Sequence, residues 1–233
     1  MEHLFKLLTA TLLGLVLTGC AGIKTTELTM KDSVRLEGKT LAVSRYNELP
    51  SFAAQTAVNV QFGALGLASA QSSGNKMIKN NGIEDPALSI AREIAQGLAA
   101  NYRVKVIEAD QFVPLNSKVD ALVKTFADYD FILDVKTLGW GSIYFTSDWN
   151  NYRVMYSAHA RLIDVANKTV LAEGLCSHVP DYGNTDDAPT YEQLENGEGL
   201  RASLANSVAF CADTIQAATK LQQPTDSALA SAK

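Results

Sequence analysis

A thiol and two imidazoles are the side chains best suited to covalent or metal chemistry. Cys176 and His178 stand two residues apart in "VLAEGLCSHV", and His159 lies in the preceding alternating segment beside Arg161. In a strand this spacing puts Cys176 and His178 on one face without making a nucleophile–base dyad. With His159 they could hold a metal ion, since zinc prefers thiolate and imidazole ligands; the simpler interpretation of His159 is an exposed strand residue. The sequence contains no G-x-S-x-G, H-E-x-x-H, P-loop or G-x-G-x-x-G pattern that would favour an enzyme.

Acidic side chains are concentrated in one segment near the C-terminus. Residues 180–199 contain no lysine or arginine and carry these acids: Asp181, Asp186, Asp187, Glu192, Glu195 and Glu198. The stretch "DYGNTDD" has the acids and the glycine of a calcium loop, but it lacks the EF-hand spacing and the distal bidentate glutamate. We expect a solvated acidic loop, with weak calcium binding or contact with a basic partner as open alternatives.

Aromatic side chains gather in "GWGSIYFTSDWNNY", which we expect to connect two strands. The stretch contains Trp140, Tyr144, Phe145, Trp149 and Tyr152, and with them both tryptophans of the chain. Tryptophan and tyrosine supply large contact areas at low entropic cost and are enriched in binding hot spots. We interpret these five residues as a partner-binding tip; the alternative is that they cover one end of the core beneath a long loop.

The N-terminus contains an apolar stretch, Leu7 to Thr18, preceded by Lys6. It is shorter than the roughly 20 apolar residues that cross a bilayer, and this arrangement is typical of a secretory signal. The sequence Leu17-Thr18-Gly19-Cys20 resembles the lipobox of bacterial lipoproteins. The resemblance implies cleavage before Cys20, acylation of its thiol, and stable anchoring through two or more acyl chains. Ala21 after the cysteine, rather than an aspartate, implies sorting to the outer membrane.

The lipobox resemblance also assigns the three cysteines. With Cys20 acylated, Cys176 and Cys211 remain in an oxidising compartment, and we expect a disulfide between them. It would close a loop of about 36 residues and contribute about 3–4 kcal/mol in the chain-entropy model. The bridge would consume the thiol that a metal site or a nucleophile requires. The rival interpretation, a reactive thiol, needs a positive and partly exposed setting.

Charge and length restrict the class of protein. The chain has 20 basic and 25 acidic side chains and a formal charge of −5, which removal of residues 1–19 leaves unchanged because Glu2 and Lys6 cancel. Without a cluster of lysine and arginine, nucleic acid and anionic lipid are not expected as the main ligands. About 200 residues suit one domain. The expected organisation is a signal peptide over 1–19, a lipidated tether over 20–37, one α/β domain over 38–222 and a flexible tail over 223–233.

The hydrophobic pattern predicts an α/β fold, with helices packed on a mixed sheet of about five strands in the order β-α-α-β-α-β-β-β-α. "KTLAVSRY" and "RVKVIEA" have the composition of strands. Asp85-Pro86 is a helix start signal, and Ser117 to Asp120 resembles a capping box. "YDFILDVKTLGWG", "NYRVMYSAHARLIDV" and "VLAEGLCSHV" form a β-meander with one covered face. The apolar stripe of the last helix, from Leu200 to Ala218, places Cys211 on its buried side.

Between Pro50 and Asn81 the chain is rich in alanine, glycine and serine and almost uncharged. We expect an amphipathic helix across Phe52–Val60, followed by the apolar but small-residue stretch "FGALGLASA". One interpretation is that Phe62, Leu65 and Leu67 touch the membrane or an identical neighbour. The other is a buried small-residue helix, or a loop lying over the core.

Three stretches carry a resemblance to known families: "ALSIAREIAQGLAANYRVKVIEAD", "DYDFILDVKTLGWG" and "ARLIDVANKTVLAEG". They are similar to the periplasmic α/β domain of the curli-secretion lipoprotein (CsgG-like) family, of the penicillin-binding-protein activator lipoproteins and of the N-terminal domain of TolB proteins. The resemblance implies a protein that binds partners or assembles into rings and is not an enzyme. This chain lacks the long amphipathic strands of the channel-forming members, which argues against a secretion pore.

We therefore expect a non-catalytic binding or accessory module of an envelope complex, anchored by lipid to the periplasmic face of the outer membrane and using no cofactor. The first alternative is a self-assembling ring or a membrane-associated secretion component. The second is a thiol- or metal-dependent enzyme centred on Cys176 and His178.

Overall fold

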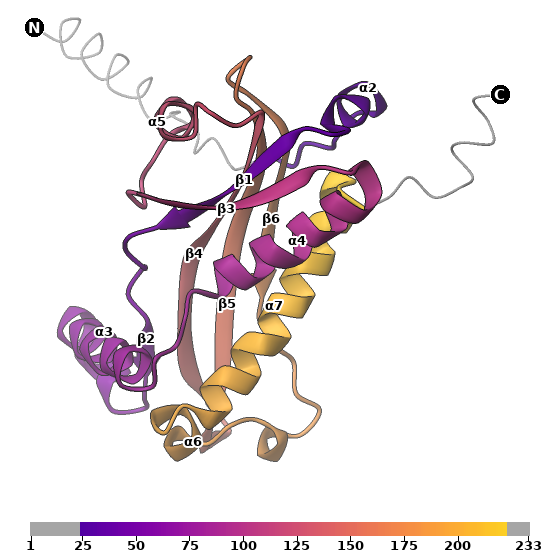
Figure 1. Cartoon of the computed structure of the whole chain (residues 1–233). Coiled ribbons are helices and arrows are strands. Elements are labelled where there is room, and N and C mark those ends of the chain that lie inside the picture. Colours follow the sequence, from indigo (N-terminus) through magenta and orange to yellow (C-terminus); the bar gives the residue numbers. More distant parts are fainter. Residues whose placement is uncertain (1–23, 223–233) are drawn as a thin grey trace, which may run out of the picture.

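The computed structural model describes residues 24–222 of the chain (Figure 1). The predicted signal peptide, the predicted acylation site Cys20 and the predicted tail from residue 223 lie outside the described residues. No helix within 24–222 is long and apolar enough to cross a membrane.

The fold is built on one mixed sheet in which β3, β1, β4, β5 and β6 lie side by side in that order, and β2 pairs with β4. The pairings of β1 with β3 and β4, and of β2 with β4, are parallel, whereas β4, β5 and β6 form an antiparallel meander. This confirms the predicted α/β class, with one short strand more than expected. The strands span Thr40–Tyr46 (β1), Ala53–Gln55 (β2), Lys105–Val113 (β3), Phe131–Phe145 (β4), Asp148–Asp164 (β5) and Thr169–His178 (β6).

Two long helices, α4 (Pro86–Tyr102) and α7 (Glu198–Thr219), lie side by side across one face of the sheet (Figure 1). The shorter α5 (Val119–Thr125) packs on the other face, and α3 (Gly63–Asn80) stands at one side of the sheet. The remaining helical turns are short: α2 (Met30–Ser33), η1 (Val34–Leu36), η2 (Asn59–Phe62), η3 (Thr185–Asp187) and α6 (Tyr191–Glu195).

Helix α4 begins where the sequence predicts it. The Asp85 carboxylate accepts a hydrogen bond from the Ala87 amide at 3.0 Å, and Pro86 occupies the first helical position, where it has no amide to leave unpaired. The buried stripe of the helix includes Ile90, Ile94 and Leu98. These side chains and the inner face of the meander form the main core.

The meander buries the face that the alternation predicts. Along β5, Tyr156, Ala158, Ala160 and Leu162 point into the main core. On the opposite face a second, smaller core lies beneath α5 and includes Phe126, Ile132 and Ile163. The sheet is therefore covered on both faces at the α5 end.

The disulfide Cys176–Cys211 joins β6 to α7, as predicted. The predicted tether over 20–37, in contrast, is too long. Thr26 pairs with Glu173 beside β6, and the Leu28 amide donates to the Thr219 carbonyl at 2.8 Å. These backbone hydrogen bonds, together with the burial of Leu28 and Leu36, show that residues 26–37 pack as part of the domain.

Two local expectations are wrong. The segment expected to form a helix across Phe52–Val60 contains the strand β2 and the start of η2, and the long helix α3 begins only at Gly63. The capping box predicted at Ser117 does not form: α5 starts after Lys118 without a side-chain cap.

Candidate functional site

The thiol and the imidazoles proposed for chemistry are not brought together. Cys176 is oxidised in the bridge, and His178 lies on the same face of the sheet, with Nδ1 2.9 Å from the Ser207 hydroxyl and its ring stacked on Phe210. His159 points to the opposite face, where Nε2 is 2.7 Å from a Glu173 carboxylate oxygen. Within residues 24–222 no three His, Cys, Asp or Glu side chains are placed to hold a metal ion.

His159 is only 5% exposed, so the expectation of an exposed strand residue is wrong. Burial lowers its pKa, and the nearby Arg161 and Lys136 act in the same direction, against the raising effect of Glu173. Its Nδ1 has no hydrogen-bond partner among the described residues. His159 is therefore a buried, mainly neutral part of the sheet.

The same face of the sheet carries a buried polar network that the sequence analysis missed. Asp134 is fully buried. One of its carboxylate oxygens accepts hydrogen bonds from the Ser44 hydroxyl, at 2.8 Å, and from the Tyr46 hydroxyl. The other oxygen accepts two hydrogen bonds from the Arg161 guanidinium, at 2.9 Å from Nε and at 2.6 Å from a terminal nitrogen. Every oxygen of the carboxylate is thus paired, and the network ties β1, β4 and β5 together. This is a structural rather than a reactive arrangement.

The acidic segment is ordered against β5. The Asn151 side chain donates to the Ala188 carbonyl at 2.7 Å, and the Tyr152 amide donates to the Pro189 carbonyl at 2.8 Å. Thr190 and Gln193 then form a reciprocal capping box at the start of α6. The carboxylates lie on turns and short helices whose backbone is held in place by these bonds.

The five aromatic residues of the predicted tip divide into two groups. Trp140 is 7% exposed, packs edge-on against Phe52 at 5.4 Å and donates from Nε1 to the Pro50 carbonyl at 2.8 Å. Tyr152 is also buried and packs against Tyr191. For these two, the interpretation as a partner-binding surface is wrong, and the alternative of core cover describes them.

The other three lie near the turn of the β4–β5 hairpin. Trp149 is 63% exposed and packs edge-on against Tyr144 at 6.2 Å between ring centroids. Phe145 lies between Tyr182 and the Arg153 guanidinium, which sits 4.8 Å from the ring centroid. The exposed tip therefore consists of Trp149 with two partly covered neighbours.

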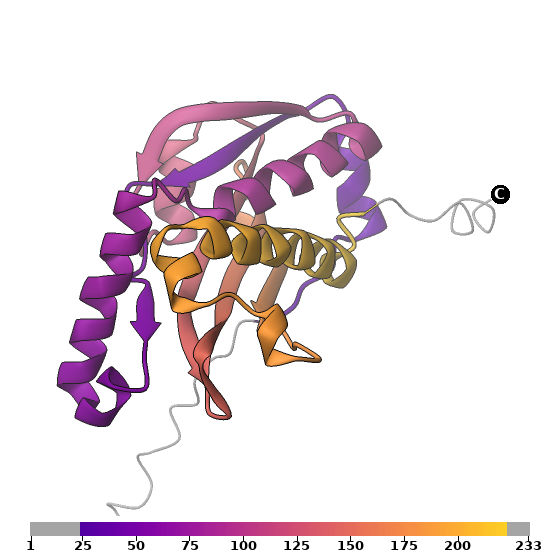
Figure 2. The ribbon, with the colours of Figure 1, turned by 90° about the horizontal axis from the view of Figure 1, so that it is seen from below.

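A second exposed apolar surface is formed by β2, η2 and α3, which we call the arm (residues 53–80). Figure 2 shows α3 and the β4–β5 hairpin extending from the body in the same direction. The arm joins the sheet through the pairing of Ala53 to Gln55 with Gly141 to Ile143. Its far end presents Phe62 at 63% and Leu65 at 80% exposure, together with exposed Val58, Val60 and Leu67.

The inner side of α3 explains why the arm is rich in small residues. Gly66, Ala70 and Gly74 recur every four residues and form the buried stripe of the helix. A Cβ atom on Gly66 would lie 1.7 Å from the Asn59 carbonyl oxygen, and one on Gly74 would lie 2.2 Å from that of Phe52. The small stripe thus lets α3 approach the backbone before it. Leu65 and Leu67 near the start of the helix remain outside, whereas Met77 near its end is buried in the main core.

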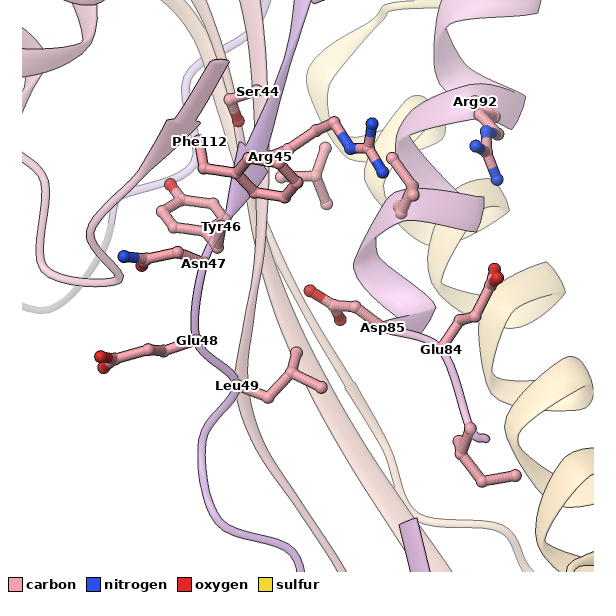
Figure 3. Close-up of a pocket in the computed structure, with 13 residues that line it drawn as sticks. Ser44, Arg45, Tyr46, Asn47, Glu48, Leu49, Glu84, Asp85, Arg92 and Phe112 are labelled. Atoms are coloured by element: carbon pink, nitrogen blue, oxygen red, sulfur yellow. The ribbon is translucent and has the colours of Figure 1, made fainter. Parts of the chain in front are cut away.

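A cleft of about 350 Å³ lies where β1 leaves the sheet (Figure 3). β4 pairs with β1 as far as Leu133 and with β2 from Gly141 onward, and residues 47–52 cross between these two pairings. The start of α4 forms the opposite wall. The carboxyl ends of β1 and β3 meet here, which is the position where open α/β sheets commonly bind ligands.

Opposite charges face each other across this cleft. The Asp85 carboxylate at the start of α4 and the Arg45 side chain from β1 both reach toward the space between the walls (Figure 3). Asp85 Oδ1 accepts from the Thr137 hydroxyl at 2.6 Å as well as from the Ala87 amide, and burial raises the Asp85 pKa. The sequence predicts Asp85-Pro86 as a helix start, but the position of Asp85 opposite Arg45 depends on the order of the strands in the sheet, for which local patterns carry no signal.

No family model matches the chain, and no curated protein matches it. Among solved structures, it is similar to the PelC dodecamer from Paraburkholderia phytofirmans, with 14% identity, a TM-score of 0.39, and coverage of 87% of this chain and 98% of that one. It is also similar to the lipoprotein GNA1162 from Neisseria meningitidis, with 17% identity, a TM-score of 0.27 and coverage of 74% and 99%. The C-terminal domain of LpoB from Salmonella enterica matches with 13% identity, a TM-score of 0.27 and coverage of 61% and 83%.

Proposed function

We propose that this protein is a non-catalytic binding module, held at the periplasmic face of the outer membrane by a lipid on Cys20, whose arm docks a protein of an envelope complex. The observation that carries the proposal is the group of exposed apolar side chains at the far end of the arm, led by Phe62 and Leu65. Contiguous exposed apolar surface on a folded domain commonly marks an interaction site.

The construction of the arm supports a contact role. Residues 49–75 carry no charged side chain, so the far end of the arm brings no charge that a partner would have to desolvate; the charged residues of the arm, Lys76 and Lys79, lie toward the other end of α3. Over its first three turns α3 packs through Gly66, Ala70 and Gly74 and leaves Leu65 and Leu67 outside, and Met77 is buried only near its end. A helix required only for stability would bury its large apolar side chains instead.

The arm and Trp149 together suit a protein partner. The arm and the β4–β5 hairpin, whose second strand includes Trp149, extend from the same side of the body (Figure 2). Trp149 packs edge-on against Tyr144, which restricts its ring on one side. Exposed aromatic and apolar side chains on one side of a molecule are the residue types enriched in interface hot spots.

The same surface supports a second candidate, self-assembly through contacts between the arms of neighbouring copies. The uncharged far end of the arm creates no like-charge repulsion between identical surfaces. The two candidates differ in what the arm contacts and can be separated in one experiment.

The test is site-specific photocrosslinking in the bacterium that makes the protein, with the probe at Leu65 and, as a matched control, at Ser72. Both positions are exposed on α3, but Ser72 lies outside the apolar group. We expect a discrete protein adduct from Leu65 and none from Ser72, and Leu65→Gln should abolish adduct formation from a probe at Trp149. A ladder at multiples of the chain mass would favour self-assembly, and absence of any protein adduct from Leu65 would refute both candidates.

A further inference from the structure

The cleft beside α4 contains two charged groups without an ionic partner among the described residues. Asp85 uses only Oδ1 in its two hydrogen bonds, and its Oδ2 has no hydrogen-bond partner within residues 24–222. Arg45 forms no salt bridge with any of these residues; its guanidinium lies 5.0 Å from the Phe112 ring centroid. A cation and an anion that face a common space without pairing with each other are suited to a ligand that carries both charges.

Other groups hold the two charges in position. The Thr137 hydroxyl donates to Asp85 and lies 2.9 Å from the Tyr156 hydroxyl, so its single proton is used and Tyr156 is the donor in the second bond. These two hydrogen bonds lead from Tyr156 in the core through Thr137 to the cleft, and they fix the orientation of the Asp85 carboxylate. On the other wall, stacking on Phe112 holds the planar Arg45 guanidinium.

Of the other charged side chains around the cleft, Arg92 is paired and Glu48 is directed elsewhere, while Glu84 beside Asp85 adds a second carboxylate to the lining and forms no ion pair within residues 24–222. Arg92 forms a two-pronged ion pair with Glu108 at 2.9 and 3.3 Å. Figure 3 shows Glu48 pointing away from the space between the walls. The apolar part of the cleft lining consists of Leu49, Ile83, Leu88 and Val135. The volume of about 350 Å³ lies at the small end of the range for ligand sites, roughly 300–1,000 Å³.

We propose that this cleft binds a small zwitterion, an α-amino acid or short peptide with an apolar side chain, whose ammonium group is held by Asp85 and whose carboxylate is held by Arg45. The apolar lining receives the side chain. Both ion pairs form in a partly enclosed site, where such contacts are stronger than on an open surface. The site is separate from the arm and does not depend on the proposed function.

The requirement for both charges gives a direct test by isothermal titration of the full chain in detergent. L-Leucine should bind at micromolar to millimolar concentration, whereas N-acetyl-leucine, which lacks the ammonium, and leucinamide, which lacks the carboxylate, should each bind at least about tenfold more weakly. The dipeptide Leu-Leu separates the two sources of such a ligand: tighter binding than leucine indicates a peptide, and weaker binding indicates a free amino acid.

Matched variants assign the binding to this cleft. Asp85→Asn removes the charge but keeps a good helix cap, and Arg45→Gln removes the opposite charge; each should weaken leucine and Leu-Leu at least about tenfold. Glu48→Gln makes the same carboxylate-to-amide change on a side chain that points away, and it should leave affinity unchanged. The proposal is overturned if neither ligand binds at millimolar concentration, if the acetylated or amidated form binds equally well, or if Asp85→Asn and Arg45→Gln retain full affinity.

Discussion

At the scale of single residues, the most consequential feature is the ion pair between Asp134 and Arg161. It lies on the sheet face opposite α4 and α7, and Asp134 is completely buried. Burial is the largest single influence on the pKa of Arg161 and lowers it, but the charge and hydrogen bonds of Asp134, with smaller contributions from Tyr46 and Glu173, together raise this pKa. Arg161 therefore remains charged inside the sheet, and removal of either member of the pair leaves the other without its partner.

We expect Arg161→Met to destabilise the fold by about 3–5 kcal/mol, because it leaves a buried carboxylate with only hydroxyl donors. Lys39→Met is the matched control. It breaks an exposed pair with Asp130 at 3.3 Å, and such pairs contribute about 1 kcal/mol or less. Urea unfolding of both variants measures the difference, and equal small losses would show that the buried pair is not needed for stability.

His159 makes stability depend on pH. Burial lowers its pKa in the folded protein, so between the unfolded pKa of about 6.5 and the lower folded value the unfolded chain binds more protons. The free energy of unfolding should then be highest above about pH 6.5 and fall as the pH drops through this window. His159→Gln should flatten the slope measured by urea unfolding.

His178 serves as the comparison for that measurement, because burial lowers its pKa as well. It is more solvated and contacts Ser207 and Phe210 rather than a carboxylate. His178→Gln should remove a smaller part of the slope. If His159→Gln keeps the full pH dependence, the loss of stability in acid comes from other groups.

The two tryptophans show what residue type alone does not determine. Trp140 and Trp149 stand nine positions apart in one hairpin, and sequence reasoning gave both the same role. Trp140 is buried because a segment distant in the sequence covers it. The Phe52 ring packs against the Trp140 ring, and the Pro50 carbonyl accepts a hydrogen bond from the indole nitrogen. The path of residues 50–52 along the sheet decides which of the two tryptophans is covered. The alternation of apolar and polar residues around Trp140 and Trp149 does not predict that path.

At the scale of elements, the strongest local patterns predicted the structure best. The β4–β5–β6 meander and α4 were identified because long alternation and a complete start signal act within a few residues. The strand β2 was missed because its three residues are held by pairing with Gly141 to Ile143, some ninety positions away. The cleft was missed for the same reason, since its walls come from β1, the loop after it and α4.

The arm offers a test at this scale. Gly74→Ala would place a methyl group 2.2 Å from the Phe52 carbonyl oxygen, so α3 must shift away from β2. We expect a loss of about 1–3 kcal/mol from overpacking, with faster amide hydrogen exchange in α3 and little change in β5 or α7.

Ser72→Ala in the same helix controls for the added helix propensity of alanine. Its side chain is exposed, so the substitution should leave exchange unchanged or slow it slightly. Unchanged protection of α3 in Gly74→Ala would mean that the small-residue stripe does not set the distance between the helix and the strand before it.

At the scale of the whole molecule, segments from the two ends of the described chain close the fold. Thr26 pairs with Glu173 at the edge of the sheet, and Leu28 donates to the carbonyl of Thr219 at the end of α7. The disulfide holds the middle of α7 to β6 from within the core. The last helix is thus joined to the meander at separate points along its length.

The disulfide is the link that can be removed without changing the sequence. Cys176 and Cys211 are separated by 35 positions, and closing such a loop restricts the unfolded chain by about 3–4 kcal/mol. Guanidinium unfolding with and without dithiothreitol should differ by that amount, with the midpoint shifted and a cooperative transition retained, because the two sulfur atoms stay buried in the reduced core. The double variant Cys176→Ala/Cys211→Ala should unfold at about the reduced midpoint and show no response to the reductant. A shift of the unfolding midpoint by dithiothreitol in that variant would show that the reductant acts elsewhere than on this disulfide. An unchanged midpoint in the wild-type protein would mean that the backbone hydrogen bonds of Thr26 and Leu28, with the packing of α7, suffice to hold the helix on the sheet.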